Sequence, residues 1–210
     1  MGDWQLIEEK LEQMLNTIFN GYDMDVLSSY EKRKIIFEYL TNNLEYDYDL
    51  LEKIRDFHVN KNKVARSSIL ELYSVMNNKK GICNAISQYY KLLLEKVGIK
   101  SHCVICDDST EVKHQLNLVY DEQTGMYSFD DVTSVIVGRG TTDEYFDYDL
   151  GFANSVGQGN KELMSGRKFL ILPEEFINYL VNKSSSITKT LDSLPSNLAS
   201  VKSKRMRKNI

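Results

Sequence analysis

Three side chains in this sequence have the types and the order that covalent catalysis by a thiol requires. Cys83 follows a glycine turn and opens an amphipathic segment, His114 opens an alternating segment, and Asp131 follows a hairpin signal at 121–125. A thiol, an imidazole and a carboxylate can serve as a nucleophile, a base and a group that orients the base. The intervals between them have room for one helix, one strand and one hairpin. The order therefore predicts a Cys-His-Asp triad.

Each of these residues also has a plainer interpretation when it is taken alone. A thiol at a helix start lies near unpaired N–H groups that favour the thiolate, but unreactive buried cysteines are equally common. His114 alone is typical of a core histidine, and Asp130-Asp131 alone is typical of a turn at a strand end. Strand alternation places the two aspartates on opposite faces. Only one of the two can therefore face His114, and alternation alone leaves open which of them does.

The hydrophobic periodicity predicts helices in the first half of the chain and strands in the second. Apolar residues recur at three and four positions over 6–18, 28–44, 67–76 and 83–97, whereas alternating or short apolar runs predict strands over 101–106, 114–120, 126–132 and 168–172. A last helix is expected from Pro173, because proline is favoured in a first helical turn. The glycine-rich segment 138–166 lacks periodicity and is expected to be a mobile loop bordering the cleft. The pattern predicts an α+β fold, with N-terminal helices, a cysteine-bearing helix and an antiparallel sheet carrying histidine and aspartate.

Length and composition limit the classes of protein to which this chain can belong. It has 210 residues, 42% of them hydrophobic, and a net charge of -4, so we expect one domain whose body does not bind nucleic acid. We assign it to 1–184, with a helical lead-in (1–80) and a catalytic core (81–183). The composition of 185–210 is rich in Ser, Thr and Lys, which predicts a disordered basic tail that either contacts an anionic partner or aids solubility.

No apolar run is long enough for a membrane span, and the N-terminus does not read as a secretory signal. Three cysteines are too few for a disulfide framework and suggest a reducing compartment. These features favour a cytoplasmic location, with export by a signal-independent route left open.

The candidate residues and their surroundings resemble the transglutaminase-like superfamily, which includes animal transglutaminases, peptide N-glycanases and many bacterial cysteine proteases. The resemblance covers about residues 28–150 and is closest to the bacterial members. Gly81-Ile82-Cys83 matches the start of the family's cysteine helix, and Gly98-Ile99 matches its end. His114-Gln115-Leu116-Asn117 is similar to a His-Ala-Trp-Asn-like motif, with Gln115 and Leu116 departing from it, and Asp131-Val132-Thr133 is similar to Asp-X-Thr. The last match favours Asp131 over Asp130 as the partner of His114, so we expect Asp130→Ala to be much closer to wild type.

The resemblance implies a papain-like thiol fold and cysteine-dependent acyl chemistry on amide or peptide bonds through a thioester. The enzyme would be a protease, deamidase or transglutaminase acting on a protein or peptide, with protease or amidase activity favoured over cross-linking. Cys83, His114 and Asp131 would be catalytic, and the Cys83 backbone N–H is a candidate oxyanion donor. Candidate cleft-lining residues are Tyr46, Asp47, Asn84 and Asn117, although Tyr46 and Asp47 also fit a solvated helix end.

Two other classes of function are considered. A transglutaminase-like fold can also be a catalytically idle scaffold that binds protein partners. Such a scaffold is expected to lack a member of the triad, whereas this sequence has all three. Cys103 and Cys106 form a C-x-x-C pair that suggests zinc, but residues three apart in a strand point to opposite faces, so a core strand is favoured. Gly157-Gln158-Gly159 is weakly similar to a nucleotide-binding turn, but no predicted strand precedes it and the sequence has no G-x-x-x-x-G-K-[ST] motif. We expect neither a cofactor nor a metal.

Overall fold

The computed structural model describes residues 3–60, 68–107, 113–148, 168–171, 173–179 and 182. The expected tail at 185–210, and the expected loop beyond residue 148, lie outside the described residues. The helices are α1 (Asp3–Ile18), α2 (Ser29–Asn43), α3 (Tyr48–Asn60), α4 (Ser68–Asn78), α5 (Cys83–Lys96), α6 (Val132–Ile136) and α7 (Thr142–Tyr145). The strands are β1 (Glu45–Tyr46), β2 (Lys80–Gly81), β3 (Ser101–Asp107), β4 (His114–Asp121), β5 (Met126–Asp130) and β6 (Lys168–Ile171).

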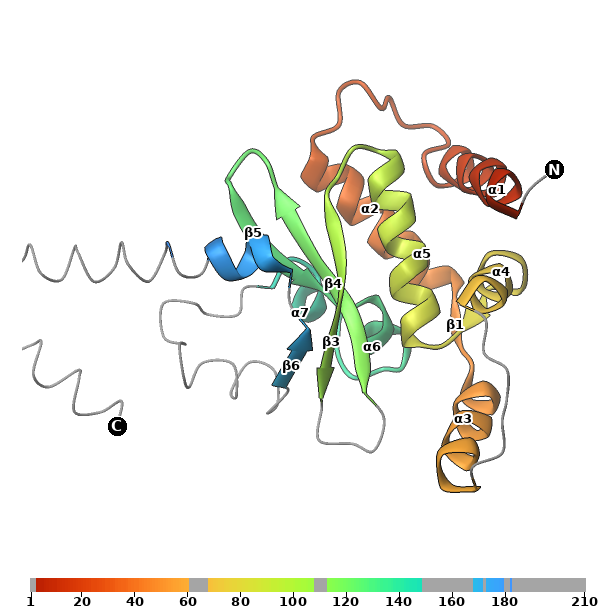
Figure 1. Ribbon diagram of the computed structural model, residues 1–210. Coiled ribbons are helices and arrows are strands. Elements are labelled where there is room, and N and C mark those ends of the chain that lie inside the picture. Colours follow the sequence, from red (N-terminus) through yellow and green to blue (C-terminus); the bar gives the residue numbers. More distant parts are fainter. Residues whose placement is uncertain are drawn as a thin grey trace, which may run out of the picture.

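The antiparallel sheet has the strand order β5-β4-β3-β6, and α5 packs against β3 and β4 (Figure 1). The hairpin between β4 and β5 closes where the Gly125 N–H donates to the Asp121 carbonyl at 2.8 Å. Gly125 has a φ of 66°, a left-handed conformation that glycine adopts without steric cost. The α+β fold class predicted from the pattern of helices and strands is confirmed.

Helix α5 lies at the centre of the main hydrophobic core. Its side chains Ile86, Tyr90 and Leu93 are fully buried, and α1, α2 and α4 all pack against it. The start of α2 is fixed by a capping box, in which the Glu31 N–H donates to Ser28 Oγ at 3.2 Å and the Ser28 N–H donates back to the Glu31 carboxylate at 2.8 Å. These contacts hold the N-terminal helices around the helix that begins with Cys83.

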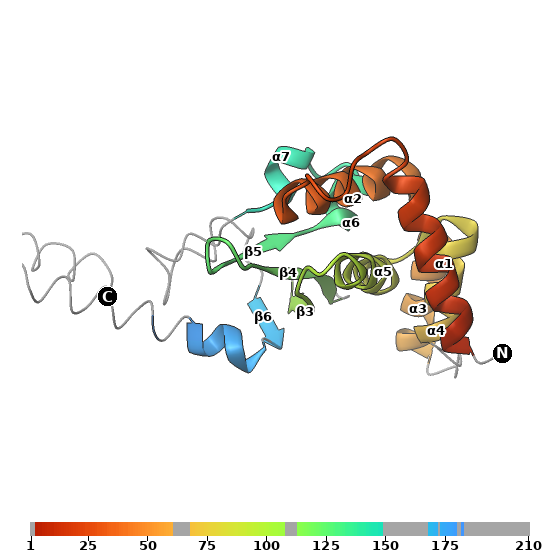
Figure 2. The same ribbon diagram turned by 90° about the horizontal axis from the view of Figure 1, so that it is seen from above.

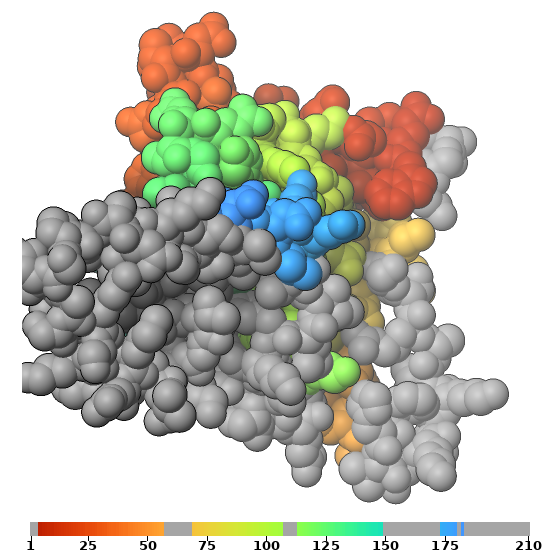
Figure 3. All heavy atoms as spheres, turned by 60° about the vertical axis from the view of Figure 1, so that its left-hand side comes forward, coloured from red at the N-terminus to blue at the C-terminus, as the bar shows by residue number. Residues whose placement is uncertain are grey.

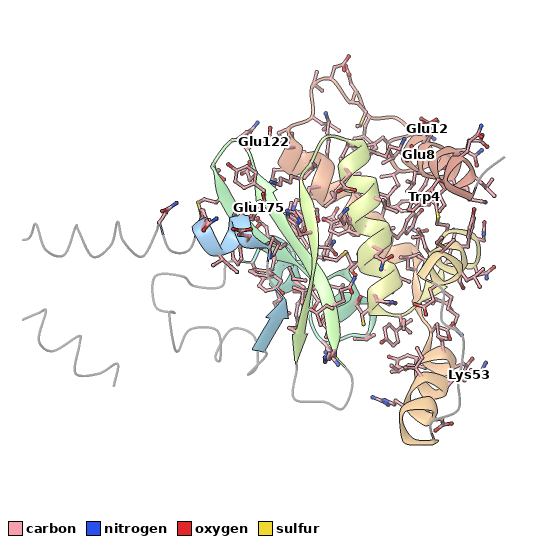
Figure 4. All side chains as sticks on the ribbon, in the orientation of Figure 1. Trp4, Glu8, Glu12, Lys53, Glu122 and Glu175 are labelled. Carbon is pink, nitrogen blue, oxygen red and sulfur yellow. The ribbon has the colours of Figure 1, made fainter. Side chains whose placement is uncertain are left out.

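A second, smaller core fills the other side of the sheet. Phe176, in a short helix over 174–179, is fully buried against Tyr127 and Phe129. Figure 2 shows α2 and α7 beside the β5 edge, whereas β6 and the 174–179 helix lie beyond β3. The same short helix lies beside the β4–β5 hairpin in Figure 3, and Figure 4 places Glu175 beside the sheet, where its carboxylate pairs with Lys100. The helix expected after Pro173 is therefore present.

Four parts of the fold differ from the sequence prediction. The one-turn helix α7 lies within the segment 138–166, which we expected to be a loop. Helix α3 forms between the predicted helices at 28–44 and 67–76, where the periodicity predicted none, and the Asp47 side chain begins it by accepting from the Leu50 N–H at 3.0 Å. Strands β1 and β2 pair in parallel although each has two residues, too few for a periodic signal. Strand β5 ends at Asp130, so Asp131 is not on a strand but caps α6. A five-residue helix is also too short for periodicity to reveal.

Candidate active site

Cys83 is the first residue of α5, at the helix end where backbone N–H groups lack helical partners. The preceding residue, Ile82, is extended and provides no side-chain hydrogen bond to the helix start. The Cys83 side chain is 8% exposed, so its sulfur is largely shielded from water. The positive end of the helix favours a negative charge at this position. This placement agrees with the environment expected from the glycine turn.

His114 and Asp131 meet directly, as the triad prediction requires. The His114 Nε2 atom lies 2.8 Å from Oδ2 of Asp131, and both residues are buried. A carboxylate accepts hydrogen bonds only, so it selects the imidazole state with a proton on Nε2. That state leaves Nδ1 as the ring atom available to a thiol.

The Asp131 carboxylate is itself fixed by the first turn of α6. Its Oδ1 accepts from the Ser134 N–H at 3.0 Å, and its Oδ2 accepts from the Ser134 hydroxyl at 2.8 Å. Aspartate is among the best N-cap residues, and Asp131 with Ser134 three positions later was the available signal for this helix start. The two bonds hold the carboxylate in a single orientation toward His114.

The imidazole of His114 is strongly perturbed by its neighbours. Burial acts to lower its pKa, but the negative charge of Asp131, their hydrogen bond and the interaction with the Cys83 side chain together raise the pKa of His114 to about 9. A histidine with an ordinary pKa is mostly neutral at pH 7. The arrangement therefore stabilises an imidazolium between a carboxylate and a thiol, and His114 contacts both of the other predicted triad members.

Tyr46 lies beside Cys83 because the β1–β2 pair brings it there. The Glu45 N–H donates to the Lys79 carbonyl at 2.8 Å, and the Asp47 N–H donates to the Gly81 carbonyl at 2.9 Å. Burial, followed by the nearby Cys83 thiol, raises the pKa of Tyr46, whereas the Cys83 backbone N–H acts in the opposite direction. The phenol is thus kept protonated next to the predicted oxyanion donor.

The other three predicted cleft residues have different surroundings. Asp47 caps α3 and pairs with Lys80 at 3.6 Å. The Oδ1 atom of Asn84 is buried without a hydrogen-bond partner among the described residues. Asn117 is 1% exposed and donates to the Ser87 carbonyl at 3.0 Å, tying β4 to α5. The cleft-lining interpretation of Asn117 is therefore corrected to a buried link between sheet and helix.

Asp130 pairs in register with Asn117 and so lies on the strand face opposite His114, as the Asp-X-Thr resemblance implied, but its surroundings were not foreseen. Its carboxylate is fully buried and forms an ion pair with Arg33 of α2, which is 3% exposed. No local pattern predicts this pair, because the two residues are 97 positions apart. The expectation that Asp130 tolerates alanine does not fit this environment, since the change would leave a buried guanidinium without its counter-charge.

The C-x-x-C cysteines lie on opposite faces of β3. Cys106 is fully buried in the smaller core, whereas Cys103 lies on the α5 side, where burial raises the pKa of its thiol. No cluster of three or more His, Cys, Asp or Glu side chains suited to a metal ion occurs within the described ranges. None of the helices described is long and apolar enough to cross a membrane.

Comparison with known proteins identifies a family that matches this chain and a solved structure with a similar fold. A family model described as a transglutaminase-like domain matches residues 20–130, a span that includes Cys83 and His114 and ends one residue before Asp131. A solved structure titled "Crystal structure of a TGase" matches with a TM-score of 0.51 and 18% identity, over 66% of this chain and 34% of that one. The chain thus spans about a third of the length of that protein. No curated protein matches it.

Proposed function

Because the chain belongs to the transglutaminase-like domain family, we propose that it carries out cysteine-dependent acyl chemistry on amide or peptide bonds. The observation that carries this proposal is the buried contact of His114 with both Asp131 and Cys83, at the start of a helix. Cys83 is the nucleophile, His114 is the acid and base, and Asp131 orients the imidazole. We assign these roles to the domain at 1–184, whose core begins at residue 81.

The first half of the reaction forms a thioester. The proton of the Cys83 thiol passes to His114, and the resulting thiolate attacks the substrate carbonyl carbon, so that a carbon–sulfur bond forms as the carbonyl oxygen gains negative charge. The imidazolium of His114 then gives its proton to the amide nitrogen, and the carbon–nitrogen bond breaks to release the amine. Asp131 keeps the ring oriented and stabilises its positive charge.

Two donors beside the sulfur are suited to the negative oxygen of that intermediate. One is the backbone N–H of Cys83, which the sequence suggests, and the other is the Tyr46 hydroxyl, which the β1–β2 pair brings beside it. A neutral phenol can donate a hydrogen bond whereas a phenolate cannot. One well-aimed donor contributes roughly 3 kcal/mol to stabilising the transition state.

The second half of the reaction transfers the acyl group from sulfur to an acceptor. Neutral His114 takes a proton from a water molecule, whose oxygen attacks the thioester, and the Cys83 sulfur leaves. An amine that reaches the thioester reacts in the same way and produces a new amide. We propose hydrolysis of a protein or peptide substrate as the main outcome, because Cys83 is buried beside Tyr46 and an amine side chain needs more room than water.

A small activated ester tests the chemistry without knowledge of the natural substrate. The purified chain is mixed with p-nitrophenyl acetate, and the release of p-nitrophenol and the mass of the Cys83 peptide are followed together. We expect one acetyl group on Cys83 that disappears with time, and faster loss with hydroxylamine, which yields the hydroxamate. Cys83→Ala should abolish the acetylation, and His114→Ala should slow it by at least about 100-fold.

The same experiment tests the alternative of an idle scaffold that binds protein partners. A folded wild-type protein that releases p-nitrophenol no faster than Cys83→Ala would contradict the enzymatic proposal. Acetylation spread equally over Cys83, Cys103 and Cys106 would contradict it as well, because the three thiols would then be equivalent in reactivity.

A further inference from the structure

A buried arginine joins α2 to the chain segment that carries Asp131. The Nε and Nη2 atoms of Arg33 donate to the two carboxylate oxygens of Asp130 at 2.7 and 2.6 Å. Two parallel bonds of this kind fix the orientation of the carboxylate as well as its position. Asp130 immediately precedes Asp131, so the pair acts on the backbone next to the proposed orienting group.

Two further donors complete the shell of Asp130. The Tyr90 hydroxyl donates to Oδ2 at 2.7 Å, and the Asp147 N–H donates to Oδ1 at 2.8 Å. Tyr90 belongs to α5, the helix that begins with Cys83. One buried carboxylate therefore ties together the thiol helix, the end of β5 and the segment around Asp147.

The rest of the guanidinium contacts that same segment. Arg33 Nη1 donates to the Asp147 carboxylate at 3.0 Å, and the guanidinium lies over the Phe146 ring, 4.9 Å from its centroid. Asp147 has a φ of 55°, which residues other than glycine seldom adopt. The backbone carbonyl of Tyr145, two residues before Asp147, accepts a hydrogen bond from the Asp131 N–H at 2.9 Å. Arg33 thus binds the residue before Asp131 and also the segment that accepts from the Asp131 backbone.

An ion pair at this depth is a poor means of gaining stability. Well-packed apolar residues often stabilise a protein as well as a buried ion pair does, because desolvating two charges offsets their attraction. Such a pair fixes the relative positions of the groups that it joins, because its hydrogen bonds are directional and their loss is costly. In this fold the geometry at stake is the 2.8 Å contact between His114 and Asp131.

We infer that Arg33 is a positioning residue of the proposed active site, which acts through Asp130 and Asp147 to hold Asp131 against His114. The inference rests on the proposed function, because it assigns Arg33 a role in the chemistry of Cys83. Arg33 itself touches none of the three proposed catalytic residues in the contacts described, so its effect is indirect.

The variant Arg33→Lys tests this, since it keeps the charge but cannot form the two parallel bonds. The pKa of His114 is measured by NMR of the imidazole, and the rate of Cys83 alkylation by iodoacetamide is measured at pH 6, both well below the melting temperature. We expect the pKa of His114 to fall from about 9 by roughly one pH unit or more. His114 stays protonated at pH 6 at either pKa, so a slower alkylation there reports that the imidazolium has moved away from the Cys83 sulfur, and we expect it to slow about tenfold because the thiolate loses its neighbouring positive charge.

The direction of the change in the His114 pKa shows whether Asp131 has moved away from His114, or whether the variant has only lost a positive charge or stability. Asp131 and Cys83 are the groups that raise the pKa of His114. Removing a nearby cation would only raise it further, whereas moving Asp131 away lowers it. A purely structural role would change the fraction of folded protein but leave the His114 pKa of the folded molecules unchanged.

Two milder variants and one control accompany Arg33→Lys. Tyr90→Phe removes one donor to Asp130, and Ser128→Ala removes the hydroxyl that accepts from Arg33 Nη2 at 2.9 Å, so both should shift the pKa of His114 in the same direction by less, and neither changes a charge. They carry the test if Arg33→Lys does not fold. The control is Lys34→Met on the same helix, because Lys34 is exposed and pairs only loosely with Glu38, at 3.9 Å. It should behave as wild type.

Folded Arg33→Lys or Tyr90→Phe proteins with the wild-type His114 pKa and the wild-type alkylation rate would overturn this inference alone. A wild-type protein in which His114 titrates as an ordinary histidine, and in which His114→Ala alkylates at the same rate, would overturn the proposed function together with the inference.

Discussion

A methyl group of Val75, on α4, occupies the space that a side chain at Gly81 would need. A Cβ built on Gly81 would lie 2.3 Å from Val75 Cγ2, well inside contact distance. Gly81 is two residues before Cys83 and accepts the hydrogen bond that holds β1, so this close approach sets the distance between α4 and the thiol helix. The glycine is required here because of packing.

Gly81→Ala should therefore lower the free energy of unfolding by about 1 to 3 kcal/mol, the usual cost of an overpacked core. Urea denaturation measures the change. The double variant Gly81→Ala with Val75→Ala should recover part of the loss, since the second change removes the colliding methyl group. Equal stability of Gly81→Ala and wild type would show that α4 moves aside without cost.

The pKa of His114 predicts how stability depends on pH. Because its pKa is raised in the folded protein, the contribution of the imidazolium is fully present below the unfolded pKa of about 6.5 and is lost as pH rises through about 9. The free energy of unfolding should fall by about 3 kcal/mol over that interval. Urea denaturation at several pH values checks this.

The control for the pH effect is His114→Gln, which cannot titrate. Its stability should change much less between pH 6.5 and 9 than that of the wild type. A wild-type stability that stays level or rises over this interval would contradict the assignment of a charged His114 beside Asp131.

Cys83 should be the first thiol to react with iodoacetamide at pH 6, because it lies at a helix start beside an imidazolium. Cys103 has a pKa raised by burial, and Cys106 is fully enclosed in the smaller core. Peptide mass spectrometry of briefly treated protein gives the order of labelling. Preferential labelling of Cys103 would contradict the prediction.

Tyr46→Phe should separate alkylation from acyl transfer. Alkylation forms no oxyanion, so its rate should remain within about twofold of wild type, whereas the rate of thioester formation should fall about 10- to 1000-fold. Acetylation of Cys83 by p-nitrophenyl acetate and its alkylation by iodoacetamide are measured on the same preparation. Tyr48→Phe is the matched control, because Tyr48 packs against Tyr46 at 5.0 Å but is half exposed. Equal acetylation rates for Tyr46→Phe and wild type would exclude the phenol as a donor.

Asp130→Ala should be severely destabilised, by about 3 to 5 kcal/mol, because it leaves the buried Arg33 charge unpaired. Thermal and urea denaturation measure this loss. Asp121→Ala is a suitable comparison, since Asp121 lies in the partly exposed β4–β5 turn and should cost much less. An Asp130→Ala protein as stable as wild type would show that Arg33 finds another partner or reaches water.

The sequence alone determined which residues are candidates and which elements carry them. Cys83 precedes a run with apolar residues at helical spacing, and His114 precedes an alternating run, so each side chain is assigned to the start of a known element by local periodicity. The turn at 121–125 brings the following strand back beside β4, which was enough to place an aspartate near His114. These features depend on residues within a few positions of one another, and local propensity can be read from sequence.

Only the tertiary structure decided which neighbours surround the site. Tyr46 reaches Cys83 through a two-residue parallel strand pair, and Arg33 reaches Asp130 across 97 positions of sequence. Neither relationship has a periodic signal, because each depends on how complete elements pack against one another. The same packing buried Asn117 as a link between sheet and helix, although its place in a motif suggested a cleft. Long-range contacts of this kind are set by the shape of the whole core, and in this protein that shape determined how the thiol, imidazole and carboxylate are held.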